Sequence, residues 1–195
     1  MYLITNRKLC NEERYIKILK EASYSGVEYI ILREKDLDDK EVEALYYKIR
    51  NNINQDTKII INSNIKVFKK VDADGIHLPF QLFIKEYNSI KNTNKIIGVS
   101  IHSKDEIKQI SNLKLSYVTF SHIYITKCKE GLEPKGIKVL NEIKKVLKKT
   151  DIKLVALGGI TPMNSKNTLM YCDDIAVMST IMQSENVRKD IYKYY

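Results

Sequence analysis

The chain has 195 residues, of which 44% are hydrophobic, and its 33 basic and 24 acidic residues give a formal charge of +9. This length allows one full hydrophobic core and is short for two domains, and no apolar run approaches the ~20 residues of a membrane span. The basic residues are spread among acidic ones, without the arginine-rich or aromatic-interleaved stripes that bind nucleic acid. We therefore expect no membrane or nucleic-acid partner. Lysine-biased, solvated helix faces explain most of the excess charge, and some of it favours an anionic small substrate.

Short β-branched runs alternate with charged segments of helical periodicity along the whole chain. Several of the runs are continuously apolar, which is typical of parallel strands buried on both faces. The expected strands are residues 2–5, 29–32, 58–61, 75–77, 96–99, 117–120, 154–157 and 175–178. The expected helical segments include residues 12–24, 39–52, 82–90, 104–112 and 137–149.

Eight strands that alternate with helices predict an α/β fold, a compact (β/α)8 TIM barrel that forms a single domain over residues 1–195. The alternative is an open, doubly wound parallel sheet. No Gly-x-Gly-x-x-Gly motif follows the first strand, which argues against a dinucleotide-binding version of that sheet.

His102 and His122 follow expected strands, His77 is the last residue of one, and His122 carries the strongest functional signal. It ends the apolar run 117–120 and precedes a polar loop that contains Thr126, Lys129 and Gly131. A histidine at the junction of a buried strand and a polar loop is placed for proton transfer. We interpret His77 as a core histidine with satisfied hydrogen bonds, and His102 as a residue of the same barrel rim.

A phosphate site is expected after the last two strands. Gly158 and Gly159 allow close approach of backbone amides, and the following Thr161-Pro162 is a natural helix start aimed at an anion. Met178 and Ser179 end the eighth strand and offer a second set of amides. In barrels a phosphate often lies between these two loops. A tight strand-to-helix turn that needs glycine would produce the same sequence pattern.

Other polar residues lie beyond the ends of expected strands. Arg33 and Lys35 follow the second strand and could clamp a carboxylate or phosphate, or form a solvated charge cluster. Asn62 follows the third strand and is interpreted as a ligand contact or a helix cap. Ser100 follows the fifth strand.

Cysteine usage favours a reducing compartment. Cys10, Cys128 and Cys172 are odd in number and scattered, and they show neither metal-ligand spacing nor a disulfide framework. The first residues do not have the long apolar stretch of a secretory signal. We therefore expect a cytoplasmic protein.

These motifs resemble the thiamin phosphate synthase/TenI family of barrels nearly from end to end. The segments that carry the resemblance are YLITNR at 2–7, LREK at 32–35, ADGIHL at 73–78, IIGVSIH at 96–102, the loop 122–136, ALGGI at 156–160 and IAVMS at 175–179.

The two branches of this family differ at a few positions. The synthases join a pyrimidine diphosphate to a thiazole phosphate with Mg²⁺, but Ile31 stands here in place of their glutamine and Asn62-Ser63 in place of their Asn-Asp pair. Residues 79–82 also lack their further metal-binding aspartate. The TenI-like branch instead carries a Gly-His pair and a Cys-Lys-x-Gly-Leu-Glu stretch. Here Ser121-His122 and residues 128–133 resemble these motifs, with serine in place of glycine.

This resemblance implies a thiazole tautomerase of thiamin biosynthesis. Such an enzyme converts the dihydrothiazole-ylidene carboxylate phosphate made by thiazole synthase into aromatic carboxythiazole phosphate. His122 would move the proton as both base and acid, so no metal and no cofactor is expected. The alternatives are a divergent thiamin phosphate synthase and a non-catalytic thiazole-phosphate-binding or regulatory protein.

The resemblance also implies roles for the remaining candidates. A homodimer is suggested by relatives. The amides at Gly158, Gly159, Met178 and Ser179 would hold the phosphate, and Arg33, Lys35, Ser100 or Lys129 would orient the carboxylate or polarise the ring.

Overall fold

The computed structural model describes residues 1–195, and of Cys128 only the backbone. Its strands run in chain order around a closed parallel barrel, which confirms the predicted (β/α)8 fold and rules out the open sheet. The strands are β1 (Tyr2–Ile4), β2 (Tyr29–Leu32), β3 (Lys58–Asn62), β4 (Gly75–Pro79), β5 (Ile96–Ile101), β6 (Tyr117–Ser121), β7 (Lys153–Leu157) and β8 (Asp174–Val177).

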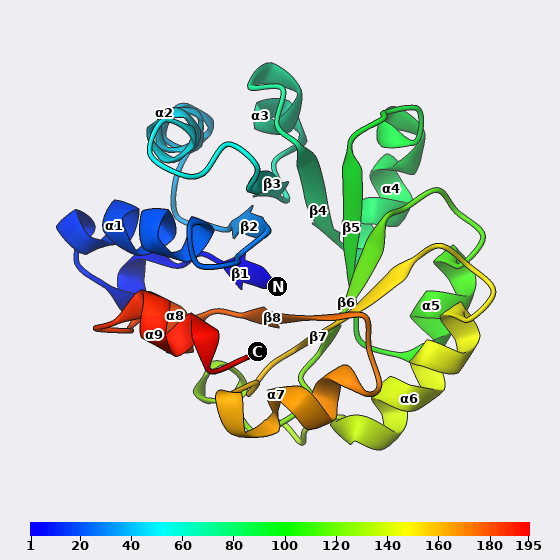
Figure 1. The fold of residues 1–195 in the computed structure, drawn as a ribbon. Coiled ribbons are helices and arrows are strands. Elements are labelled where there is room, and N and C mark those ends of the chain that lie inside the picture. Colours follow the sequence, from blue (N-terminus) through cyan, green and yellow to red (C-terminus); the bar gives the residue numbers. More distant parts are fainter. The chain divides into compact units, whose positions relative to one another are not determined.

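Helices alternate with the strands, as Figure 1 shows. They are α1 (Glu12–Ser23), α2 (Asp39–Arg50), α3 (Ile65–Lys70), α4 (Phe80–Ile90), α5 (Lys104–Ile110), α6 (Gly136–Leu147), α7 (Pro162–Leu169), α8 (Ser179–Met182) and α9 (Val187–Tyr192), with 3₁₀ turns η1 (Arg7–Leu9) and η2 (Lys127–Lys129). None of the helices described is both long and apolar enough to cross a membrane.

Local sequence signals set several helix starts. Ser103 caps α5, because its hydroxyl accepts a hydrogen bond from the Glu106 amide at 3.1 Å. Asp38 and Glu41 form a reciprocal capping box at α2. These bonds satisfy amides that the first turn of a helix leaves without partners.

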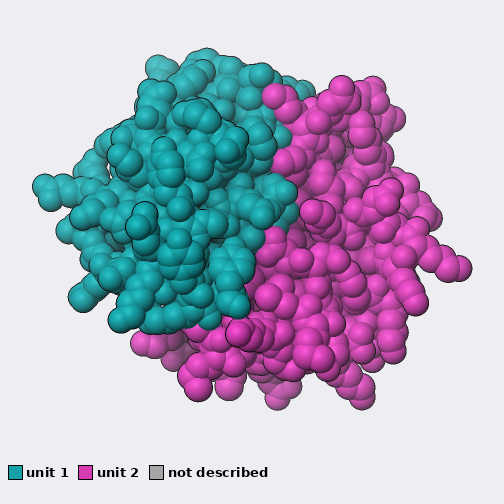
Figure 2. Space-filling view, viewed as in Figure 1, with its two compact units in different colours: residues 1–76, 177–195 teal, residues 77–176 magenta. Residues whose placement is uncertain are grey.

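The chain divides into two compact units, coloured separately in Figure 2. Residues 1–76 with 177–195 form the first unit, and residues 77–176 form the second. Each has its own buried apolar strands: Ile30 and Ile60 are fully buried in the first unit, as are Val118 and Leu154 in the second. The expectation of a single domain stays a prediction, and the two units are described separately below.

Two strand ends differ from the sequence expectation in a way that concerns the site. β5 continues to Ile101, so Ser100 lies inside the strand and pairs with Thr119 of β6 instead of following the strand. Asn62 is the last residue of β3 instead of a loop residue. A polar residue on one face does not end a strand, because successive side chains point to opposite faces.

Candidate functional site

In the second unit, His122 directly follows β6 and is buried. The whole of β6 is buried, and His122 is only 3% exposed. Its Nε2 lies 3.2 Å from the carbonyl oxygen of Leu132, so Nε2 donates a hydrogen bond to the loop that follows. The Lys135 amide donates to the His122 carbonyl at 2.8 Å. His122 thus closes the loop 123–135 at both its side chain and its backbone.

The two glycines after β7 pack against this same segment. The Tyr124 amide donates to the Gly158 carbonyl at 3.0 Å, and both Gly158 and Gly159 adopt positive φ, 98° and 69°. A β-carbon on Gly159 would come within 2.6 Å of the Ile125 carbonyl oxygen. Close approach of the chain to itself therefore requires glycine here, and phosphate binding by their amides stays a proposal.

Helix α7 begins as the sequence predicts. Thr161 is the N-cap and Pro162 the first helical residue. The Thr161 amide donates to the side chain of Asn164 at 2.8 Å, and the Asn164 side-chain amide donates to the Gly159 carbonyl at 3.0 Å. These two hydrogen bonds fix the start of α7 to the glycine turn. The N-terminus of the helix carries the partial positive charge of the helix dipole.

Ser100 belongs to a buried polar cluster across β4, β5 and β6. His77 Nε2 lies 2.7 Å from the Ser100 hydroxyl, and His77 Nδ1 lies 3.0 Å from the Tyr117 hydroxyl. The Thr119 hydroxyl is a further 3.3 Å from that of Ser100. Both ring nitrogens of His77 have partners, which fits its interpretation as a core histidine. His102, by contrast, is exposed, with Nδ1 3.3 Å from the Ser121 carbonyl oxygen.

Lys129 lies in η2, on the loop that His122 closes. Burial, and after it the nearby positive charge of Lys135, lowers the pKa of Lys129 from its ordinary value. Within the part of the chain that the structure describes, no acid forms an ion pair with Lys129, and a partly buried ammonium of this kind is suited to an anion. The Cys128 side chain, which belongs to the motif 128–133, lies outside the part described.

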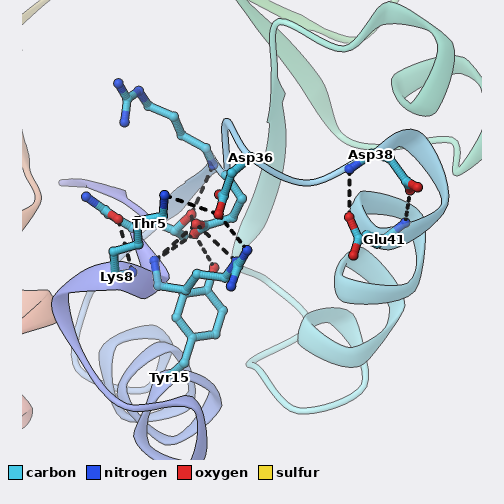
Figure 3. A network of polar contacts seen from close by, with 10 residues as sticks. Thr5, Lys8, Tyr15, Asp36, Asp38 and Glu41 are labelled. Carbon is cyan, nitrogen blue, oxygen red and sulfur yellow. Dashed lines mark hydrogen bonds and ion pairs between the residues drawn. The ribbon is translucent and has the colours of Figure 1, made fainter.

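In the first unit, a buried carboxylate organises the ends of β1 and β2 (Figure 3). The Glu34 carboxylate accepts hydrogen bonds from the Thr5 hydroxyl at 2.7 Å and the Tyr15 hydroxyl at 2.9 Å. The Arg7 amide donates to both of its oxygens at 3.1 Å. The Thr5 hydroxyl also accepts from the Arg33 amide at 2.9 Å.

Around this carboxylate the cations fall into two sets. Arg7 lies 2.8 Å from Asp36 and 3.9 Å from Glu34, and Lys8 lies 3.3 Å from Asp36. Arg33 and Lys35 take part in no ion pair with any described residue. The predicted anion clamp therefore has two uncompensated charges on one short segment.

The remaining first-unit candidates lie at the ends of β3 and β8. Asn62 donates from its side chain to the Ser63 hydroxyl at 3.0 Å, and Ser63 adopts φ 63°. Asn64 caps α3 at Val67. Met178 precedes α8 and Ser179 is its first residue.

Sequence reasoning missed Glu34, Thr5 and Tyr15. Thr5 and Glu34 stand 29 positions apart in the sequence, and Tyr15 and Glu34 stand 19 apart. One signal was available: Glu34 is the single acid between two bases directly after an apolar strand, where a buried charge needs dedicated partners.

Comparison with known proteins gives the family. The profile described as thiamine monophosphate synthase matches residues 1–181. The chain belongs to the thiamine monophosphate synthase family. A "Putative thiamine-phosphate synthase 2" of Aquifex aeolicus is 34% identical over 166 residues, 83% of this chain and 85% of the relative. The "Thiamine-phosphate synthase" of Methanobrevibacter smithii is 31% identical over 95% of this chain and 88% of its own length.

A solved structure agrees with this assignment. Thiamine phosphate pyrophosphorylase from Pyrococcus furiosus superimposes with a TM-score of 0.81 at 26% identity, over 99% of this chain and 92% of that one. These similarities correct the expected thiazole tautomerase: the two relatives are named as thiamine-phosphate synthases and the similar structure as a thiamine phosphate pyrophosphorylase, each over most of its length. The tautomerase expectation depended on a few motif positions, whereas the similarity to synthases extends over most of the chain.

Proposed function

We propose that the chain is a divergent thiamine-phosphate synthase, a transferase that couples a pyrimidine diphosphate to a thiazole phosphate. The similarity to synthases along nearly the whole chain carries this proposal. In the coupling, the thiazole nitrogen forms a bond to the pyrimidine methylene carbon while the bond from that carbon to the diphosphate oxygen breaks. Pyrophosphate leaves with the bonding electrons.

The rim cations support a role in holding the diphosphate. Arg33 and Lys35 carry uncompensated charge in the first unit, and Lys129 is a partly buried ammonium in the second. Cations placed where negative charge develops on a leaving group stabilise the transition state. We assign Arg33 and Lys35 to the diphosphate.

The thiazole phosphate is assigned to main-chain donors. The amides of Gly158 and Gly159 precede α7, whose N-terminus favours an anion, and the amides at Met178 and Ser179 are the other candidates. Either Ser100 within β5 or Asn62 at the end of β3 is proposed as a polar contact to the pyrimidine half, since each is half-buried.

His122 has a different role in this reaction from the one expected of a tautomerase. Joining the two halves turns a neutral thiazole nitrogen into a thiazolium, and this step removes no proton from carbon. Because Nε2 of His122 is directed at the Leu132 carbonyl, the side chain is suited to hold the loop that carries Lys129. We assign it as a positioning residue.

Magnesium, which the family resemblance implies, does not fit the described residues. No group of three His, Cys, Asp or Glu among them could hold a metal ion. Ser63 follows Asn62 at the end of β3, and Glu34 and Asp36 are occupied by Thr5, Tyr15 and the neighbouring cations. No step is therefore assigned to a metal.

The test is direct coupling of the two synthetic halves, with thiamine phosphate measured by oxidation to fluorescent thiochrome. We expect turnover by the wild-type chain and its loss in Arg33→Ala. Thiazole phosphate binding by calorimetry without any product would instead identify a non-catalytic binding protein. Sedimentation velocity on the same sample would test the predicted homodimer.

A further inference from the structure

The segment Arg33-Glu34-Lys35 alternates between the interior and the surface. Glu34 is buried, with only 2% of its side chain exposed, whereas Arg33 is half-buried and Lys35 is exposed. Arg33 and Glu34 lie in the irregular segment directly after β2, and a turn begins at Lys35. Fixing the Glu34 side chain in the interior restrains the backbone from which its two basic neighbours extend.

The bonds to Glu34 reach the backbone of Arg33 itself. Thr5 is the link, because its hydroxyl donates to Glu34 at 2.7 Å and accepts from the Arg33 amide at 2.9 Å. Tyr15 of α1 holds the same carboxylate oxygen at 2.9 Å. Figure 3 labels Thr5, which follows β1, and Tyr15 of α1, whose hydroxyls both donate to the Glu34 carboxylate.

Glu34 and Asp36 also form ion pairs with two other cations of the first unit. Arg7 and Lys8 are paired with Glu34 and Asp36, so their charges are compensated within the protein. Arg33 and Lys35 have no such partner among the described residues. An anion that reaches this rim meets two cations whose positions are set and whose charges are uncompensated.

We propose that Glu34, held by Thr5 and Tyr15, is a positioning residue that presents Arg33 and Lys35 to the diphosphate of the substrate. This inference rests on the proposed function for the identity of the ligand. Glu34 touches no reacting atom in this scheme; it acts through its two neighbours.

Tyr15 is the residue best suited to test this role. Burial, and after it the adjacent Glu34 charge, raises the pKa of Tyr15 well above its ordinary value, so the phenol keeps its proton and donates. Tyr15→Phe removes that one donor and keeps the ring in the core. Tyr46→Phe is the matched control, because Tyr46 is also a largely buried tyrosine of the first unit, on α2.

The experiment is calorimetric titration with inorganic pyrophosphate of the wild type, Tyr15→Phe, Thr5→Val, Tyr46→Phe, Arg33→Ala and the double variant Tyr15→Phe/Arg33→Ala. Loss of one hydrogen bond to a charged group predicts a Kd about tenfold weaker in Tyr15→Phe. Tyr46→Phe should bind as the wild type does. In the Arg33→Ala background the Tyr15 substitution should have little further effect, because the two residues act together.

Steady-state kinetics provide a second measurement, and a loss of stability alone would not change its result. Tyr15→Phe should raise KM for the pyrimidine diphosphate and leave KM for the thiazole phosphate unchanged. Unchanged pyrophosphate affinity in Tyr15→Phe and Thr5→Val, with only a lower Tm, would overturn the inference, as would a wild type that binds no pyrophosphate. Coupled binding effects without any turnover would sustain the positioning role and refute the synthase assignment instead.

Discussion

Gly158 lies so close to His122 that a β-carbon at position 158 would stand 2.3 Å from the β-carbon of His122 and 2.8 Å from its α-carbon. The α-carbon belongs to the backbone, so no change of side-chain rotamer can relieve this contact. Gly158 also adopts φ 98°, in the region that other residues rarely occupy. The end of β7 and the segment after β6 therefore fit together only with glycine at this position.

Gly158→Ala should consequently be among the most destabilising small substitutions in the chain. The clash and the positive φ together predict a loss of about 2–4 kcal/mol in the free energy of unfolding. Urea denaturation followed by circular dichroism measures this directly. Gly131→Ala is the control, because Gly131 has φ 79° but nothing within 4 Å of the added carbon, so only about 1 kcal/mol should be lost. Equal losses in the two variants would show that the contact with His122 is unimportant.

His122 is predicted to act on the loop it closes. His122→Ala removes the donor to the Leu132 carbonyl, so the loop 123–135 should open more often and trypsin should cleave after Lys127 and Lys129 faster. Loss of one hydrogen bond predicts turnover reduced by about tenfold. His122→Asn keeps an N–H donor and should recover part of both properties. Cleavage at the wild-type rate in His122→Ala would contradict a positioning role.

The barrel could be predicted from the sequence because its signal is local. Each buried parallel strand is a short apolar run, and each run is separated from the next by a helix-period segment. Strand ends were less certain. Ser100 looked like a loop residue, but inside β5 it faces His77 and Thr119, where a hydroxyl is satisfied by side chains of neighbouring strands. A partner on another strand is invisible in a single sequence.

The candidate site was predictable in part, for the same reason. Arg33 and Lys35 were recognised as rim cations. The ion pairs of Arg7 and Lys8, however, are formed with Glu34 and Asp36, which lie far from them in the sequence. The glycines after β7 were interpreted through a ligand, whereas the structure shows the protein's own backbone against them. Individual motif positions such as Ile31 and Ser63 favoured the wrong branch, while similarity along the whole chain favours the synthases.

Metal independence is the third prediction. Because Asn62-Ser63 supplies no carboxylate at the end of β3 and both Glu34 and Asp36 are already paired, coupling should continue in EDTA at a rate within about twofold of that in Mg²⁺, with side-chain cations compensating the diphosphate. Ser63→Asp is the informative variant: Ser63 has φ 63°, which aspartate tolerates well. This change should create a measurable Mg²⁺ dependence. Loss of wild-type activity in EDTA, restored by Mg²⁺, would contradict this prediction.

The last prediction concerns the stability of the second unit at high pH. Burial raises the pKa of the Cys172 thiol from 9.0 to about 11, and Sγ donates to the Thr168 carbonyl at 3.3 Å. Between these two values the unfolded thiol loses its proton while the folded one keeps it, so the unfolded state binds fewer protons. Stability is therefore fully present below pH 9 and falls as the pH rises toward 11.

At about 1.4 kcal/mol for each pH unit, this difference amounts to roughly 2–3 kcal/mol across the range. Cys172→Ala should lack that contribution, although it loses some stability at every pH through the missing sulfur. Urea unfolding of both proteins at several pH values from neutral to 11 measures the difference, which should shrink as the pH rises. A constant difference between the two proteins would mean that the Cys172 thiol ionises equally readily in the folded and unfolded chains.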